Sequence, residues 1–152
     1  MAASAATTVT AAPPGAESLF LRVRDGLRLH VRRYGRDRRR RPVLCLPGLT
    51  RNGRDFTMLA EALAGDAVHP RTVYALDYRG RGLSDHDPDW KNYTVPVEAQ
   101  DVVDVMAALD LHGAALIGTS RGGLIAMVLG ALQPAAFGPV VLNDIGPVIE
   151  RE

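Results

Sequence analysis

The chain has 152 residues, and 18 lysine and arginine residues against 17 aspartate and glutamate residues give it a formal net charge of +1. With 47% hydrophobic residues it has the composition of a globular protein with one sizeable core, while its balanced charge argues against nucleic-acid binding through a broad basic field. No apolar run approaches the ~20 residues of a membrane span, and a single cysteine, Cys45, excludes an intrachain disulfide framework or a thiolate metal cluster. We therefore expect no metal and no cofactor, and the cysteine content fits a reducing, cytoplasmic location.

The N-terminal part of the chain divides into a tail and a hairpin. The first sixteen residues are small, uncharged and proline-containing, so we expect a disordered tail over residues 1–16. Residues 18–23 and 27–33 alternate apolar and polar side chains around Asp25-Gly26, which is a favoured two-residue turn. This pattern predicts an antiparallel hairpin.

After residue 42, short apolar runs alternate with helical patterns. The runs predict strands that are buried on both faces, at 43–46, 72–76, 114–117 and 140–142. Apolar residues at helical spacing, or a longer apolar stretch, predict helices near 56–63, 97–109 and 124–132. The order predicts an α/β fold, a three-layer sandwich whose mostly parallel sheet is antiparallel only at the N-terminal hairpin.

The stretch Gly118-Thr119-Ser120-Arg121-Gly122 has the pattern G-x-S-x-G. It stands directly between a predicted buried strand and a predicted helix, which is the context that a nucleophile elbow requires. The alternative is an ordinary strand-to-helix turn. We interpret Ser120 as a nucleophile, with the backbone N–H groups of Arg121 and of Leu49 as the oxyanion donors.

Three motifs together resemble the α/β-hydrolase superfamily, in its single-domain esterase, lactonase and carbon–carbon hydrolase branch. They are L-C-L-P-G-L-T at 44–50, D-Y-R-G-R-G-L-S-D at 77–85 and I-G-T-S-R-G-G at 117–123. Pro47 stands where the family usually has histidine. The resemblance implies the first six of the family's eight strands, in the spatial order 1-2-4-3-5-6, so we interpret 17–152 as the N-terminal portion of a hydrolase core without its lid and last two strands. It also implies that the arginine and aspartates of 77–85 are structural.

The resemblance narrows the chemistry through the identity of the nucleophile. Relatives that open epoxides or remove halide carry aspartate at the elbow, whereas Ser120 implies acyl transfer through an acyl-enzyme. The predicted function is hydrolysis of a small ester, lactone or related acyl substrate. No nucleic-acid or membrane partner is expected.

The general base is missing from the sequence. The family order is serine, then aspartate or glutamate, then histidine, and no histidine follows Ser120. Asp144, after the last predicted strand, is a candidate acid. Of the four histidines, only His86 is expected on Ser120's edge of the sheet, and it matches no catalytic position; the others are His30, His69 and His112.

Two hypotheses therefore remain. The first is a serine hydrolase that is incomplete and inactive as this chain. The second is a non-catalytic, truncated remnant that binds a ligand or a partner, or a second copy of itself, through the unprotected sheet edge at 140–142.

Two geometric expectations follow from the elbow pattern. Ser120 should have φ > 0 and no histidine within hydrogen-bond range. Arg121 and Asp144 begin adjacent loops, so we expect them to form a partly buried ion pair, because either charge alone is costly to desolvate. The rival interpretation is that Arg121 points into the pocket to meet an acidic substrate.

Overall fold

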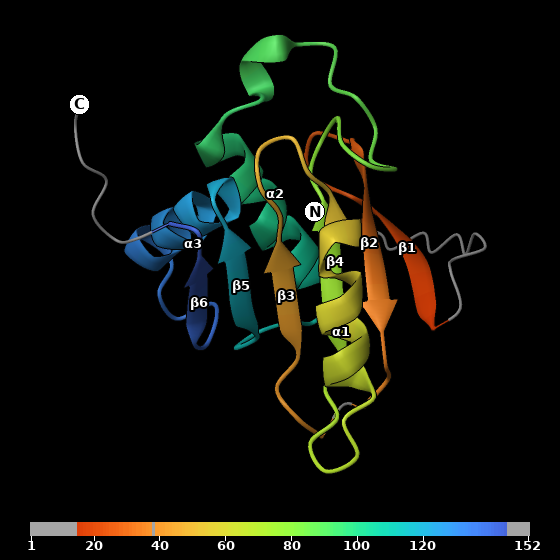
Figure 1. Cartoon of the computed structure of the whole chain (residues 1–152). Helices are drawn as coiled ribbons and strands as arrows, with labels where there is room; N and C mark the ends of the chain where they lie inside the picture. The colour runs from red at the N-terminus through yellow and green to blue at the C-terminus, as the bar shows by residue number, and fades with distance from the viewer. Residues whose placement is uncertain (1–14, 38, 146–152) are drawn as a thin grey trace.

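The computed structural model describes residues 15–37 and 39–145 (Figure 1). Its strands are β1 (Ala16–Arg22), β2 (Arg28–Tyr34), β3 (Val43–Leu46), β4 (Val73–Asp77), β5 (Ala115–Thr119) and β6 (Val140–Asn143). Its α-helices are α1 (Thr57–Ala64), α2 (Val95–Ala108) and α3 (Arg121–Leu132), and two short 3₁₀ helices are η1 (Gly53–Phe56) and η2 (Trp90–Asn92).

The strands form one six-stranded sheet in the order β1-β2-β4-β3-β5-β6. The strands β1, β2 and β4 pair antiparallel, whereas β3 pairs parallel with β4 and β5, and β5 pairs parallel with β6. The predicted α/β class, the mixed sheet and the strand order are confirmed. Helix α1 covers one face of the sheet and helices α2 and α3 cover the other (Figure 1), so the sandwich has three layers.

Each face of the sheet has its own apolar cluster. On the α2 and α3 face, buried side chains run from the first strand to the fifth; they include Leu19, Leu29, Leu44, Leu76, Val102, Leu116 and Ile125. The cluster under α1 is smaller and contains Tyr34, Val43, Cys45, Phe56, Ala60, Val73 and Ala75. Alternation along each strand sends neighbouring residues to opposite faces, which explains how strands so short can serve both clusters.

Several boundaries differ from the sequence-based expectation. The first strand begins at Ala16, inside the predicted tail, and residues 1–14 lie outside the described residues. The hairpin is closed by the bond from the Val23 N–H to the Leu27 carbonyl, so its loop has three residues rather than two. Gly26 takes the left-handed conformation with φ 91° that such a loop needs at its last position.

The last strand is less buried than its sequence predicts. Val140 is 39% exposed and Val141 is 54% exposed, although their register with Leu116 and Ile117 places them on opposite faces of the sheet. Strand β6 lies at the end of the strand order and pairs with β5 alone among the described strands. The predicted sheet edge at 140–142 is confirmed for the described residues, whereas the predicted burial of this strand is wrong.

Candidate active site

Ser120 is the single residue between β5 and α3. The turn that joins these two elements lies at the carboxyl end of the parallel strands (Figure 1). Its backbone has φ 50° and ψ −112°, a conformation that costs a non-glycine residue about 1–3 kcal/mol. The Ser120 N–H donates to the Asn143 carbonyl at 3.0 Å, and the Ser120 carbonyl accepts from the Gly123 N–H at 2.8 Å. The predicted φ > 0 is confirmed, and these hydrogen bonds hold the strained turn between β6 and the first turn of α3.

Two glycines of the G-x-S-x-G pattern allow the backbone to pack this closely. A Cβ atom on Gly122 would overlap the carbonyl oxygen of Leu46 in β3, and one on Gly118 would overlap the backbone of Gly122. Helix α3 therefore begins in direct backbone contact with two strands. A larger residue at either position would push the helix away and displace Ser120.

The candidate oxyanion donors are on two loops that meet at Ser120. Arg121 is the first residue of α3, and its N–H has no acceptor within the helix because the first N–H groups of any α-helix have none. The loop after β3 passes beside the serine, since a Cβ on Gly48 would lie 3.9 Å from the Ser120 Cβ. Leu49 follows in that loop and is 53% exposed. Within residues 15–37 and 39–145, its N–H makes no hydrogen bond.

The side chain of Arg121 turns to α2 instead of to Asp144. Its Nε donates to Glu98 Oε2 at 2.5 Å, and its Nη2 donates to the Tyr93 carbonyl at 3.2 Å. Asp144 is exposed, with φ 56°. The predicted Arg121–Asp144 pair is wrong, because Glu98 is fully buried and a buried carboxylate gains more from a guanidinium than an exposed one does.

None of the four histidines forms a hydrogen bond with Ser120 within the described ranges. His30 is fully buried, and both ring nitrogens are engaged: Nδ1 lies 2.8 Å from Asp77 Oδ2 and Nε2 lies 2.9 Å from Ser18 Oγ. The other three are exposed, and they are His69, His86 and His112. The expectation that Ser120 has no histidine partner is confirmed for this part of the chain.

Asp77, at the end of β4, is the acceptor at the centre of a buried network. Burial raises the pKa of its carboxyl, but hydrogen bonds from His30 and from the N–H groups of Gly53 (2.7 Å) and Leu83 (3.0 Å) outweigh burial and bring the pKa below its ordinary value. Asp77 is therefore ionised at neutral pH. Its contacts fix the loop that follows β4 and do not reach Ser120, which agrees with a structural role.

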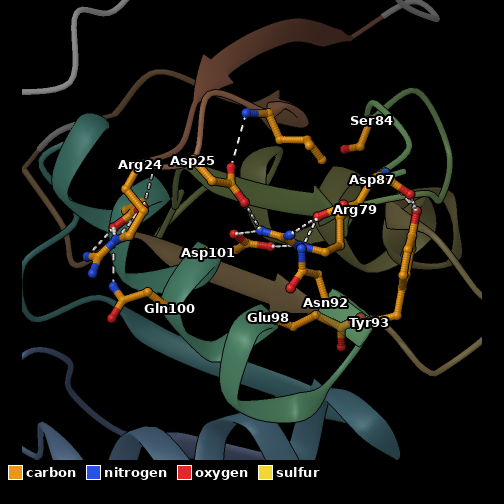
Figure 2. Close-up of polar contacts among 12 residues, drawn as sticks. Arg24, Asp25, Arg79, Ser84, Asp87, Asn92, Tyr93, Glu98, Gln100 and Asp101 are labelled. Atoms are coloured by element: carbon orange, nitrogen blue, oxygen red, sulfur yellow. Dashed lines mark hydrogen bonds and ion pairs between the residues drawn. The ribbon is translucent and has the colours of Figure 1, made fainter. Parts of the chain in front are cut away.

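Arg79 occupies the centre of a second charged cluster (Figure 2). Its side chain is 2% exposed and donates to both carboxylate oxygens of Asp101, at 2.6 and 2.7 Å. It also donates to Asp87 at 2.6 Å and to Asp25 at 2.9 Å. Arg79 thus joins the hairpin loop, the loop after β4 and helix α2.

A third group of side chains lies between that cluster and Ser120. Glu98 accepts from Arg81 Nη1 at 2.5 Å as well as from Arg121. Tyr78 is fully buried nearby, and its hydroxyl has no hydrogen-bond partner among the described residues. Burial, followed by the charge of Glu98, raises the pKa of Tyr78 well above its ordinary value. The tyrosine is neutral and cannot serve as a base.

Glu98 and Asp101 lie near the N-terminal end of α2, where the helix dipole favours acidic side chains whether or not they have a partner. The signal that could have found their partners is the helix spacing. Both residues fall on the same face as Val102 and Val105, which are fully buried. Two carboxylates on an apolar helix face require cations beside them, and these are Arg79 for Asp101 and both Arg81 and Arg121 for Glu98.

The described residues contain no group of three or more histidine, cysteine, aspartate or glutamate side chains placed to hold a metal ion. None of their helices is both long enough and apolar enough to span a bilayer.

Comparisons with known proteins agree with this geometry. The sequence profile of a family described as "alpha/beta hydrolase fold" matches residues 41–150. The chain is 38% identical over 120 residues to a 3-hydroxybutyrate-oligomer hydrolase of Cupriavidus necator. These 120 residues cover 79% of this chain and 40% of that protein. The chain is 41% identical over 86 residues to Esterase YbfF of Escherichia coli, or 57% of this chain and 33% of the esterase.

Among solved structures, an α/β hydrolase from Novosphingobium aromaticivorans superposes with a TM-score of 0.81 at 46% identity, over 88% of this chain and 45% of that one. The chain therefore belongs to the α/β-hydrolase family. It spans about two fifths of the length of the Cupriavidus relative.

Proposed function

We propose that Ser120 is the nucleophile of a serine hydrolase that cleaves small esters, lactones or related acyl compounds. The observation that carries this proposal is the φ of 50° at Ser120, between β5 and α3. Backbone strain of this kind persists only where the surrounding structure enforces it, and it clusters at active sites. The names of two relatives, an oligomer hydrolase and an esterase, agree with an acyl substrate.

In the proposed reaction, Ser120 Oγ attacks the acyl carbonyl carbon. The carbonyl oxygen becomes an oxyanion, which accepts hydrogen bonds from the N–H groups of Leu49 and Arg121. The bond to the leaving alcohol then breaks, the alcohol takes a proton, and the acyl group remains on Ser120. Water attacks this acyl-enzyme, releases the acid and restores the serine.

The proton on Ser120 Oγ needs a base, and the described residues place no imidazole beside it. The family resemblance implies a histidine, a lid and two further strands. We propose that they correspond to the part of the relatives that this chain does not cover. Asp144 follows β6 in the loop next to Ser120, and we propose it as the candidate acid. The 152-residue chain alone should therefore show only trace turnover.

The test is to treat the purified chain and its Ser120→Ala variant with a fluorophosphonate probe, which labels activated serines. We expect no labelling of either. A second pair joins residues 1–145 to the remainder of the Novosphingobium hydrolase, with and without Ser120→Ala. Labelling should appear in the joined protein and disappear with the serine. If the joined protein folds and stays unlabelled, the proposed nucleophile is wrong.

Rapid, serine-dependent labelling of the chain alone would instead show that it contains a base. His86 would then be the first residue to test, because it is exposed in the loop between β4 and α2. A His86→Gln variant that lost this labelling would identify it.

A second candidate function is a binding module, and the exposure of Val140 and Val141 favours it. An apolar edge strand with unpaired backbone groups recruits other strands. Sedimentation at tens of micromolar should then show self-association that Val141→Lys abolishes without loss of stability. A stable monomer would contradict this role.

We also propose a cytoplasmic location. The support is Cys45, a buried free thiol in a chain with no other cysteine. Fractionation of the expressing cells tests it, and recovery from a secreted or membrane fraction would contradict it.

A further inference from the structure

Glu98 is a buried carboxylate that the proposed reaction does not use. It lies in the first turn of α2 and is fully buried, and each of its carboxylate oxygens accepts one charged hydrogen bond, from Arg81 and from Arg121. Both arginine side chains are 15% exposed. A carboxylate in this position is tolerated only because two guanidinium groups compensate its lost hydration.

Through these two arginines, Glu98 is connected to both loops that carry the proposed oxyanion donors. Arg81 Nε donates to the carbonyl of Leu49 at 2.9 Å. Arg121 directly follows Ser120, and its guanidinium is held by Glu98 and by the Tyr93 carbonyl. One carboxylate thus joins the loop after β3 to the start of α3 by charge-assisted hydrogen bonds.

We propose that Glu98 is a positioning residue that sets the N–H groups of Leu49 and Arg121 relative to one another; this rests on the proposed function of those groups. Leu49 is 53% exposed, so its loop position depends more on hydrogen bonds than on packing. Oxyanion donors act only when they are fixed before the charge develops. Glu98 does not touch the substrate and acts through the arginines.

The chain offers a matched control on the same helix. Asp101 lies three residues after Glu98, is 2% exposed, and binds Arg79 through both carboxylate oxygens. The Arg79 guanidinium reaches Asp25 and Asp87 but neither Leu49 nor Arg121. Glu98→Gln and Asp101→Asn therefore both break a buried ion pair, and only the first breaks the connection to the donors.

The direct test follows backbone amide resonances by NMR in the ¹⁵N-labelled full chain, with thermal unfolding measured in parallel. In Glu98→Gln, the amide signals of Leu49 and Arg121 should shift or broaden together. In Asp101→Asn they should stay in place, although both variants lose stability. Unmoved signals in Glu98→Gln, or equal shifts in both variants, would overturn the proposal.

If Glu98→Gln does not fold, Arg81→Met replaces it, because this arginine is partly exposed and its loss leaves Glu98 with one cation. The connection predicts that the Arg121 amide responds to this change, although no hydrogen bond joins Arg81 to Arg121 among the described residues. A response confined to the loop of Leu49 would contradict the role of Glu98.

A kinetic readout separates this inference from the proposed function. The Ser120-dependent part of p-nitrophenyl acetate hydrolysis is the difference between the chain and its Ser120→Ala variant. We expect Glu98→Gln to lower its kcat about 10-fold with little change in KM, since removal of one donor costs roughly 10²–10³ and displacement costs less. Asp101→Asn should match the parent per folded molecule. If Ser120→Ala equals the parent, the chain has no Ser120-dependent turnover. The amide signals alone then decide the role of Glu98, and labelling of the joined protein decides the proposed function.

Discussion

The two faces of the sheet are held together in different ways. On the α2 and α3 face, apolar side chains from five strands form one continuous cluster. On the α1 face, the apolar cluster covers the middle strands, and a polar network of Ser18, His30 and Asp77 is buried over β1, β2 and β4. Toward β6, at the end of the sheet, this face becomes exposed to solvent, and Val141 is 54% exposed there.

Ser120 follows β5, where the covered part of the sheet meets the open part. Its strained turn is fixed from the covered side, because Gly122 packs on the Leu46 backbone of β3. Its hydrogen bond to Asn143 ties it to the exposed strand β6. The geometry of Ser120 therefore depends on packing on the α3 side of the sheet, while the neighbouring surface on the α1 side stays exposed.

The largest effect should come from Asp77→Asn, which tests the polar part of the α1 face. The change leaves the His30 ring, the buried Gly53 N–H and the partly buried Leu83 N–H without a carboxylate, and breaking a buried pair costs about 3–5 kcal/mol. Chemical denaturation at pH 7 measures the loss of unfolding free energy.

The same variant has a predicted pH dependence. The folded pKa of Asp77 is lowered, so its charge stabilises the fold above the unfolded value of about 3.9, and this contribution is lost as pH falls through the folded pKa. The difference between parent and variant should therefore shrink below about pH 4. A constant difference down to pH 2 would show that the carboxylate charge does not stabilise the network.

The second prediction compares an apolar residue from each region. Leu116 in β5 is fully buried on the α2 and α3 face, so Leu116→Ala should lower the unfolding free energy by about 2–5 kcal/mol, independently of pH. Its partner strand supplies the control, because Val141→Ala on the open face should change stability by less than about 0.5 kcal/mol. Equal losses would mean that Val141 is covered in solution, as self-association through β6 would require.

The same contrast explains what the sequence could predict. Apolar runs and turn residues predicted the strands, the helices and, with the family resemblance, the strand order. They predicted β6 to be buried, because an apolar run reports what a strand can bury and not what covers it. The elbow was predictable since local glycines enforce it. The partner of Arg121 was not, because Glu98 stands 23 residues away and only the packing of α2 against α3 brings them together.

The third prediction concerns the backbone strain that the packing of α3 against β3 imposes on Ser120. Glycine adopts a φ of 50° without the strain that a Cβ atom causes, but it also loses more backbone entropy on folding. The relief of strain is the larger of the two, so Ser120→Gly should raise the unfolding free energy by about 1 kcal/mol. Ser120→Ala keeps the Cβ and is the matched control, with no relief of strain expected. If both variants have the same stability, the turn is not strained in solution.

The last prediction involves no change in stability and concerns the reactivity of Cys45, which lies on the α1 face and is fully buried in β3. Burial raises the pKa of its thiol to about 12, so hardly any reactive thiolate exists at pH 8. Modification by a disulfide reagent should therefore proceed only as fast as the chain opens, and at once in denaturant. The matched control is Val141→Cys in a Cys45→Ser background, which places a thiol on the open part of the same face and should react within seconds. If native Cys45 reacted as fast as that control, the cluster under α1 would be open to solvent, and the two parts of this face would not differ in accessibility.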